Sequence, residues 1–383
     1  MKIGYKEFVS NPVFPVNRML RREQHMRCSD DLHGRILYLQ DEGKPFVHIS
    51  IDSVEIYQKV RNQIKVIVED CLCQDIHLVV SATHSHNCPC ITTDQQYQDY
   101  LLNLIKQAMN DLIIQEYETL SYQYQYQYFD QVGCSRVVCQ KSDQIYAETL
   151  SIYHNTKRLA TILIHNVHPT IRKLWEGDFT AEYPGYVITK LKEIYPDEFF
   201  TFMLGPAGDI SPRFVRKASD EAEMKRLAEC LLQEYQRQLT LPLSLVALDG
   251  LAYEEIELTI GRTIRTPDNV TLPKDMCEEE LAILEKARVG YKHEQEEVIS
   301  SHLFSHLILS KTYSMIFEPF ELYSGFYRSV NKAHCSLITI SNGFDHYVTD
   351  LRPQRVAREL FADTVADQTK EEMMALFHRW SEQ

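Results

Sequence analysis

Short apolar segments that alternate with amphipathic helical segments constrain the fold of this chain more than any other feature. RILYLQ and FVHISID, residues 35–40 and 46–52, indicate strands around the turn DEGK, and residues 54–72 then carry apolar side chains at helical spacing. Further strands are expected at residues 75–83 and 120–130, at 159–169, where the strand ends in a polar turn, and at the start of 199–212, where a Gly/Pro-rich loop follows it. Further helices are expected at 100–114, 181–195 and 221–239. Strands that end in polar loops and alternate with helices predict an α/β fold with a mixed β-sheet flanked by helices.

The rest of the chain predicts further elements of the same unit. Residues 243–260 indicate one or two strands, and residues 274–309 are charged with a helical pattern, which predicts a small helical lobe or lid. Residues 336–348 return to strand and turn, and the last stretch of the chain has a helical pattern. No repeat and no long linker separates these segments, so we expect residues 1–383 to form a single large catalytic domain.

Composition excludes several classes of protein. With 383 residues, 44% of them hydrophobic and 25% charged, the chain can bury a sizeable core. The formal net charge of -14 argues against a nucleic-acid partner. No apolar stretch approaches the roughly 18 residues of a membrane span, and the first residues show no secretory signal. Ten cysteines in such a chain indicate reduced thiols. These features predict a cytoplasmic protein.

Polar side chains follow several of the expected strands at the point where each strand ends. These groups are His84/His86, His165/His168, Asp209/Ser211 and Asp345/His346/Tyr347. In an open α/β sheet, ligands bind beyond the carboxyl ends of the strands, so these groups can meet in one cleft. Each group alone is more often structural than functional, but two histidine-bearing strand ends can supply the nitrogen ligands of a catalytic zinc.

The stretch VVSATHSHNCPC, residues 79–90, contains the first of these groups. His84 and His86 stand at positions i and i+2, so their side chains share one face if the strand continues. This is the geometry of a metal ligand beside a second catalytic group, and equally that of two surface histidines. Cys88 and Cys90 can join a metal site, but their spacing around a proline favours structural thiols.

The motifs SATHSH, NVHPT, GPAGDISP, FEPF and SNGFDHYV, taken in this order, resemble those of the catalytic domain of the neutral/alkaline (non-lysosomal) ceramidase family. The resemblance extends over roughly Met1–Val348. It implies a zinc-dependent hydrolase whose metal ligands are His84, His168, Glu318 and Tyr347. By the same resemblance, His86 stabilises the reacting carbonyl, Arg136 contacts the substrate, and Ser211 belongs to the G-D-x-S loop of the family.

These implied roles are consistent with simple chemistry. A zinc ion would lower the pKa of its bound water to ~7 and polarise an amide carbonyl, and His86 could donate a hydrogen bond to the developing oxyanion. Ser211 either positions the substrate or acts as a nucleophile, and a nucleophile needs a base within hydrogen-bond reach. We favour the metal-activated water, because the assigned histidines leave no base for the serine.

The sequence departs from the family pattern at several places. Residues 87–90 replace the glycines that follow the second histidine, and a second tyrosine that follows the ligand tyrosine has no counterpart. The chain ends at Gln383, so we expect no C-terminal immunoglobulin-like domain. These differences concern the substrate rather than the metal ligands.

Two functions therefore stand beside each other. The first is hydrolysis of a linear amide bond in an N-acyl, ceramide-like compound by a metal-activated water. The second is that of a non-catalytic or divergent relative that keeps the metal scaffold and binds a small lipid, sugar or phosphoester ligand. The order of the motifs favours the first, with a small-molecule, lipid-like amide as substrate, and the sequence is compatible with any oligomeric state.

Overall fold

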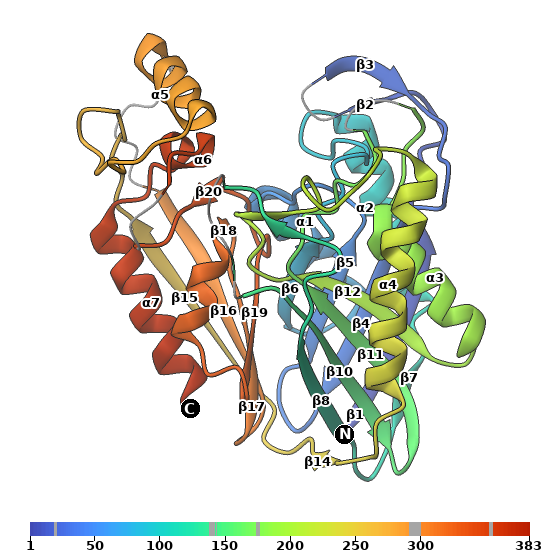
Figure 1. Ribbon diagram of the computed structural model, residues 1–383. Helices are drawn as coiled ribbons and strands as arrows, with labels where there is room; N and C mark the ends of the chain where they lie inside the picture. Colours follow the sequence, from blue (N-terminus) through green and yellow to red (C-terminus); the bar gives the residue numbers. More distant parts are fainter. Residues whose placement is uncertain (19–20, 138–141, 143, 174–176, 291–299, 352–354) are drawn as a thin grey trace.

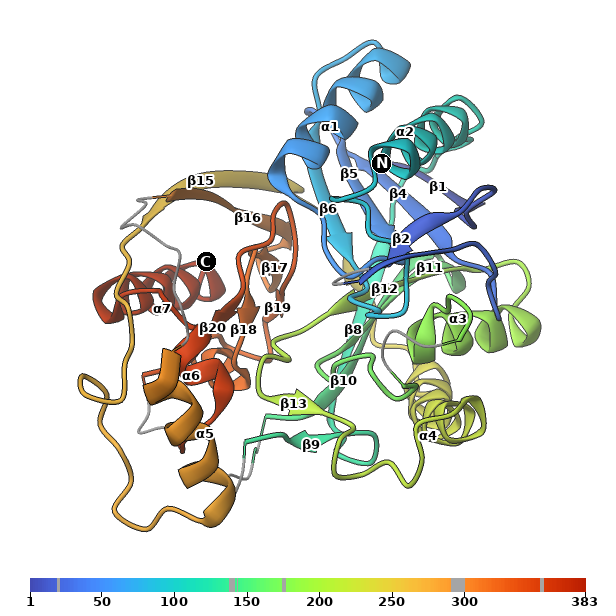
Figure 2. The same ribbon diagram turned by 90° about the horizontal axis from the view of Figure 1, so that it is seen from above.

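Three β-sheets of four or five strands, each backed by helices, meet around a common centre (Figures 1 and 2). The structure is a computed structural model that describes residues 1–383 except 19–20, 138–141, 143, 174–176, 291–299 and 352–354. The expected α/β fold, with mixed sheets flanked by helices, is confirmed.

The first sheet comes from the N-terminal part of the chain. Its strands, in spatial order, are β6 (His77–Ala82), β5 (Phe46–Ile51), β4 (His33–Gln40), β1 (Lys2–Val9) and β7 (Ile114–Glu116). The β5–β6 pair is parallel and the others are antiparallel. Strands β5 and β6 are almost wholly buried, because helices cover one face of the sheet and the core between the sheets covers the other.

The second sheet follows the same plan. Its strands are β12 (Phe199–Leu204), β11 (Lys157–His165), β10 (Tyr146–His154), β8 (Ser121–Tyr128) and β14 (Val246–Ala247). Again one pair, β11–β12, is parallel. The tyrosine- and glutamine-rich stretch SYQYQYQY forms β8, as its period of two predicts.

The third sheet corrects one sequence-based expectation. Its strands are β15 (Ala252–Ile260), β16 (Ser300–Ser310), β17 (Tyr313–Phe317) and β19 (Cys335–Ile338). Of the segment 274–309 expected to be helical, only α5 (Glu278–Gly290) is a helix, and residues 291–299 lie outside the described residues. Residues 300–309 belong to strand β16, because its backbone pairs with β15 and β17, and tertiary pairing overrides local pattern.

Helices α1 (Gln58–Leu72), α2 (Gln95–Asn110), α3 (Glu182–Ile194), α4 (Glu221–Leu239) and α7 (Asp367–Ser381) cover the outer faces of the sheets. The short helix α6 (Arg358–Ala362) packs against β20, and the 3-10 helix η1 (Ser324–Ser329) contributes Phe326 and Tyr327 to the core. Helix α2 begins earlier than expected because the Asp94 side chain accepts a hydrogen bond from the Tyr97 N–H at 3.1 Å and caps it. Helices α1 and α2 pack on the first sheet, α3 and α4 on the second, and α7 on the third. None of the helices in the described ranges is long and apolar enough to cross a membrane.

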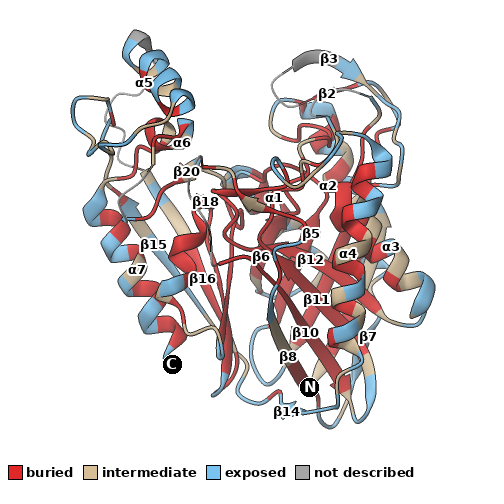
Figure 3. Cartoon of the chain, viewed as in Figure 1, coloured by how far each residue is buried: buried red, intermediate tan, exposed pale blue. Residues whose placement is uncertain are grey.

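Two large apolar clusters form the core (Figure 3). One packs helices α1 to α4 against the first two sheets and includes Ile64, Leu101 and Leu231. The other fills the space between the three sheets and includes Met203 and Phe317. Buried apolar surface on both sides makes the strands rigid supports for the loops that leave them.

The loops that follow β6, β12 and β19 are tied together at one end of the sheets. The N–H of Asn342 donates to the Val80 carbonyl at 2.8 Å, and the N–H of Val80 donates to Asn342 Oδ1 at 3.0 Å. The N–H of Thr339 donates to the Leu204 carbonyl at 2.9 Å. The carboxyl ends of the parallel strands therefore converge, which is where α/β folds place their ligands.

Short strand pairs hold the remaining loops of this region. They are β2 (Val16–Arg18) with β3 (Arg21–His25), β9 (Cys134–Ser135) with β13 (Ile210–Ser211), and β18 (Glu321–Leu322) with β20 (Tyr347–Val348). The β18–β20 pair is parallel and sets Glu321 opposite Tyr347.

Candidate metal centre

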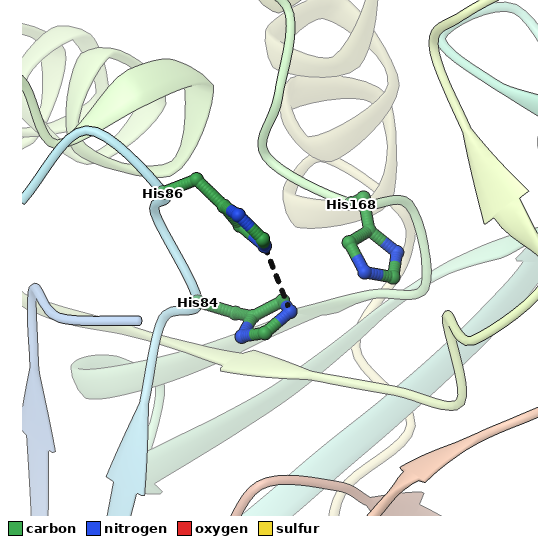
Figure 4. A group of neighbouring side chains, drawn as sticks. All are labelled: His84, His86 and His168. Carbon is green, nitrogen blue, oxygen red and sulfur yellow. Dashed lines mark hydrogen bonds between the residues drawn. The ribbon is translucent and has the colours of Figure 1, made fainter. Parts of the chain in front are cut away.

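Three imidazole rings meet where these loops converge (Figure 4). His84 and His86 follow β6, His168 follows β11, and one ring nitrogen from each lies within 4.8 Å of the other two. His84 and His168 are 0% and 1% exposed. Within the described ranges this is the only group of three or more His, Cys, Asp or Glu side chains placed to hold a metal ion.

Backbone carbonyl groups orient two of the rings. His84 Nδ1 lies 2.6 Å from the Val54 carbonyl oxygen, and His168 Nδ1 lies 2.7 Å from that of Ala207. In the neutral tautomer each Nδ1–H donates to its carbonyl, which leaves the lone pair of Nε2 free on the other side of the ring. Metal-binding histidines are oriented in the same way.

The carboxylate of Glu321 faces these two Nε2 atoms. Its Oε2 lies 3.1 Å from His168 Nε2 and 3.5 Å from His84 Nε2. With the ring protons on the carbonyl side, nitrogen lone pairs confront an oxygen lone pair, and such groups repel unless a proton or a metal cation lies between them. Imidazole nitrogens with one carboxylate oxygen form a donor set that suits Zn²⁺.

Burial sets the protonation of this centre. Burial lowers the pKa of His168 to about 4 and holds the pKa of His86 well below its ordinary value. For Glu321, burial acts to raise the pKa, but His84 and His168 outweigh it and hold the pKa well below the usual range of a carboxyl group. Neutral imidazole and ionised carboxylate are the states that metal binding requires.

Known proteins were compared with the chain by sequence and by structure. No family model matches the sequence, and no curated protein matches it either. A crystal structure of neutral ceramidase from Pseudomonas aeruginosa superposes with a TM-score of 0.78 at 13% identity, covering 100% of this chain and 74% of that chain. The chain has the neutral ceramidase fold. A ceramidase complexed with C2 matches with a TM-score of 0.74 at 12% identity and the same shares, 100% and 74%. The resemblance in the motifs is thus confirmed as a likeness of fold, and it covers the whole chain.

In this example of the ceramidase fold, backbone strain gathers around the histidines. His84 has φ 65°, and Ile340, Asn342 and His346, in the loop after β19, have φ values of 52°, 62° and 52°. The left-handed region is unfavourable for side chains other than glycine, most of all for a β-branched residue such as Ile340. Strain of this kind is retained mainly at functional sites.

Tyr347 lies beside the histidines through its strand pairing. The β18–β20 register sets it opposite Glu321, and its ring centre is 6.5 Å from that of His168. Burial raises the pKa of its phenol above the ordinary value, although Arg136 acts in the opposite direction. A phenol in this place is neutral unless a strong cation acidifies it.

Arg136 lies against the ring of Tyr347. Its guanidinium carbon lies 4.8 Å from the centre of the Tyr347 ring, and its backbone N–H donates to the Asp209 carbonyl at 2.8 Å. Glu359, in helix α6, forms an ion pair with it at 3.4 Å. Sequence reasoning did not single out Glu359, because only the packing of α6 against β20 brings it here.

Glu318, which the motifs indicated as a metal ligand, lies at the end of β17 and is wholly buried. Its Oε2 accepts a hydrogen bond from the Phe320 N–H at 2.8 Å, and burial raises its pKa well above the ordinary value. The carboxylate in contact with the histidines is instead that of Glu321, the second glutamate of FEPFEL. Two glutamates in one motif could have raised this alternative from sequence.

Ser211 is the neighbour of Ile210, which contacts His168, and among the described residues no hydrogen bond joins its hydroxyl to a histidine. In the described residues its hydroxyl accepts one hydrogen bond, from the Arg213 N–H at 3.3 Å. Its neighbour Ile210 accepts from the His168 N–H at 3.2 Å, so the GPAGDISP loop supports the ring of His168 rather than presenting a serine to it.

The two cysteines of the first motif are separate from the imidazole group. Cys88 and Cys90 are buried free thiols. Their sulfur atoms lie near the Thr180 carbonyl and the Thr92 hydroxyl, at 3.5 and 3.3 Å. These contacts agree with the interpretation of both as structural thiols.

Proposed function

We propose that the protein is a zinc-dependent hydrolase that cleaves a linear amide bond in an N-acyl compound. The observation that carries this proposal is the meeting of His168 Nε2 and His84 Nε2 with the Glu321 carboxylate oxygen, at 3.1 and 3.5 Å. These three atoms form a donor set that a divalent cation would accept. The fold supports the proposal, since the solved proteins that share it are described as ceramidases.

The ligands in this proposal are His84, His168, Glu321 and Tyr347, with Glu321 in place of Glu318. When bound, zinc at such a site lowers the pKa of a water molecule to ~7 and polarises the amide carbonyl. Carbonyl anchors on His84 and His168 keep their Nε2 atoms directed at the site before any metal arrives, which reduces the entropy lost on binding.

His86 is the group placed to serve the substrate. Its Nε2 is 3.2 Å from His84 Nε2, and its Nδ1 is buried with no hydrogen-bond partner among the described residues. A ring N–H beside the metal ligands can donate to the oxygen that becomes negative when the amide carbonyl is attacked. Arg136 would bind another part of the substrate, and Ser211 would support the loop that positions it.

Metal analysis combined with an activity screen tests the proposal. We expect about one zinc per chain in the purified protein and hydrolysis of at least some members of a panel of N-acyl amines. The double change His84→Ala and His168→Ala should abolish both. His378→Ala is the matched control, because His378 is exposed on α7, and it should change neither.

Two results would count against the proposal in different ways. Zinc content that survives the double change contradicts the assigned ligands. Stoichiometric zinc without hydrolysis of any N-acyl amine favours instead a divergent relative that keeps the metal scaffold as a binding site.

A further inference from the structure

One edge of the Arg136 guanidinium is buried and forms no hydrogen bond among the described residues, although Glu359 makes an ion pair with it. Both Nε and Nη2 of Arg136 lie away from solvent without a hydrogen-bond partner among the described residues. No other buried guanidinium in the described part of the chain leaves both nitrogens of this edge unpaired. A buried donor without a partner is costly, so an unpaired pair of donors points to a group that is supplied from outside the chain.

Elsewhere in the protein the same edge has a consistent use. Several arginines grip one glutamate through Nε and Nη2 together, with two hydrogen bonds side by side. They are Arg158 with Glu198, at 2.6 and 3.2 Å, Arg226 with Glu223, at 2.8 and 2.7 Å, and Arg237 with Glu234, at 2.9 and 2.7 Å. This edge matches the two oxygens of a carboxylate, whereas a hydroxyl or carbonyl group offers only one oxygen.

The surroundings of Arg136 hold the guanidinium in place and leave that edge unsatisfied. The Tyr347 ring covers one face at 4.8 Å. Glu359 Oε1 lies 3.4 Å from Nη2, close enough for an ion pair, but Nη2 forms no hydrogen bond. Because the Tyr347 ring also lies 6.5 Å from the His168 ring, the Arg136 guanidinium is one residue removed from the histidines of the candidate metal centre.

We propose that the substrate carries a carboxylate close to the amide bond, as an N-acyl amino acid does, and that Arg136 binds this carboxylate through Nε and Nη2. The inference rests on the proposed amide hydrolysis and specifies its substrate class. In that reaction water adds across the C–N bond: its hydroxyl goes to the acyl carbon and its other proton to the nitrogen. The products are a fatty acid and a free amino acid.

A matched pair of substrates tests this inference on the unaltered protein. N-octanoylglycine and N-octanoylglycinamide have the same acyl chain and nearly the same shape, but the carboxamide presents an N–H donor where the acid presents a second acceptor. We expect kcat/KM to favour the acid by at least about tenfold, because a site built around hydrogen bonds rejects an analogue that leaves them unmade. Equal kcat/KM for the two compounds would overturn the inference and leave the proposed amide hydrolysis intact.

Variants of two arginines test whether Arg136 causes the preference for the acid over the carboxamide. Arg136→Gln should reduce the ratio of the two kcat/KM values to about one, whereas Arg213→Gln, which alters an exposed arginine of the neighbouring loop, should leave the ratio unchanged. A ratio that persists in a folded Arg136→Gln protein would contradict the assignment of Arg136.

The fatty acid product is a second source of the same carboxylate chemistry. Calorimetric titration with octanoate and with N-octanoylglycine, on an inactive His86→Ala protein, separates the two sources. We expect Arg136→Gln in that background to weaken N-octanoylglycine by at least about tenfold and to leave octanoate unchanged. The opposite pattern would assign the edge to the product and overturn the inference. These binding measurements still decide the inference if no amide is hydrolysed, which would refute only the proposed function.

Discussion

The metal centre and the seam between the second and third sheets each bury a carboxyl group, and the two groups respond to burial in opposite ways. In the seam, Glu148 of β10 is 0% exposed and accepts hydrogen bonds from the hydroxyl groups of Tyr327 and Ser336. Burial raises its pKa to about 7 in spite of these hydrogen bonds. At the metal centre, Glu321 is almost as deeply buried, yet its two histidine neighbours hold its pKa well below the usual range.

The difference lies in the chemistry of the neighbours. Hydroxyl groups supply hydrogen bonds without charge, and the neighbours of Glu148 are mainly hydroxyl-bearing side chains together with Lys332: Tyr124, Tyr146, Tyr313, Tyr327 and Ser336. Surroundings dominated by neutral hydroxyl groups tolerate a protonated acid. The imidazole rings of His84 and His168 place a nitrogen atom 3.5 and 3.1 Å from the Glu321 carboxylate, and their interaction with it favours the ionised form in spite of burial. Burial alone therefore does not identify a functional carboxyl group, but its partners do.

The largest effect expected from this comparison concerns two glutamates of one motif. Glu321→Gln should lower zinc affinity by at least about a hundredfold, because removing a ligand costs more than the 10- to 100-fold typical of outer-shell changes. Glu318→Gln is the matched control: it is equally buried and three residues away, and it should leave zinc content unchanged. Competition with a chromophoric chelator measures both affinities. If Glu318→Gln loses the metal and Glu321→Gln keeps it, the motif-based ligand was the right one.

His86 should separate metal binding from catalysis. His86→Ala should lower kcat on an active N-acyl substrate by roughly 10²–10³, the usual cost of one lost oxyanion donor, while zinc content stays near that of the unaltered protein. Steady-state kinetics and metal analysis on the same preparation provide the comparison. Parallel losses of zinc and activity would instead make His86 a ligand.

Glu148 should make the free energy of unfolding fall over a range of pH in which Glu321 causes no such change. Its folded pKa of about 7 lies above the ordinary 4.5, so its stabilising contribution is complete below pH 4.5 and is lost as pH rises toward 7. The loss amounts to at most about 3.5 kcal/mol, at ~1.4 kcal/mol per pKa unit. Glu148→Gln removes this pH-dependent contribution to stability.

Urea unfolding of both proteins at pH 5 and pH 8 measures the effect, and the difference between the two proteins cancels other buried acids such as Glu182, whose pKa burial also raises to about 7. We expect the unfolding free energy of the unaltered protein to fall more between these pH values than that of Glu148→Gln. Equal changes would show that Glu148 is not protonated in the folded state.

The smallest effect is expected at Ser211. Ser211→Ala should retain about a tenth or more of kcat, a loss of no more than ~1.4 kcal/mol, because within the described ranges its hydroxyl accepts from the Arg213 N–H and has no hydrogen bond to a histidine. Rapid-quench mass spectrometry on an active substrate supplies the second readout. A burst of product with an acyl group on Ser211 would replace the proposed route with a covalent one.

The local sequence pattern was sufficient to predict most of the secondary structure and the strand ends that carry the histidines. Helix α4 spans the predicted residues 221–239, and the tyrosine-rich strand and the strands before His84 and His168 lie where their periodicity placed them. These elements follow from the spacing of apolar side chains, which a linear sequence displays directly. The strand β16 was missed because its partners β15 and β17, rather than its own pattern, make it a strand.

The sequence by itself determined the class of fold, the strand ends that carry His84, His86 and His168, and the family that its motifs resemble. Only the tertiary structure decided which carboxylate meets them, because the parallel pairing of β18 with β20 and the contacts of Glu321, not Glu318, bring that side chain to the two Nε2 atoms. The tertiary structure also brings Glu359 into an ion pair with Arg136, while Nε and Nη2 of Arg136 form no hydrogen bond among the described residues. Contacts between residues far apart in the chain depend on how whole sheets pack. The spacing of residues along the sequence does not fix hydrogen-bond distances to within one ångström.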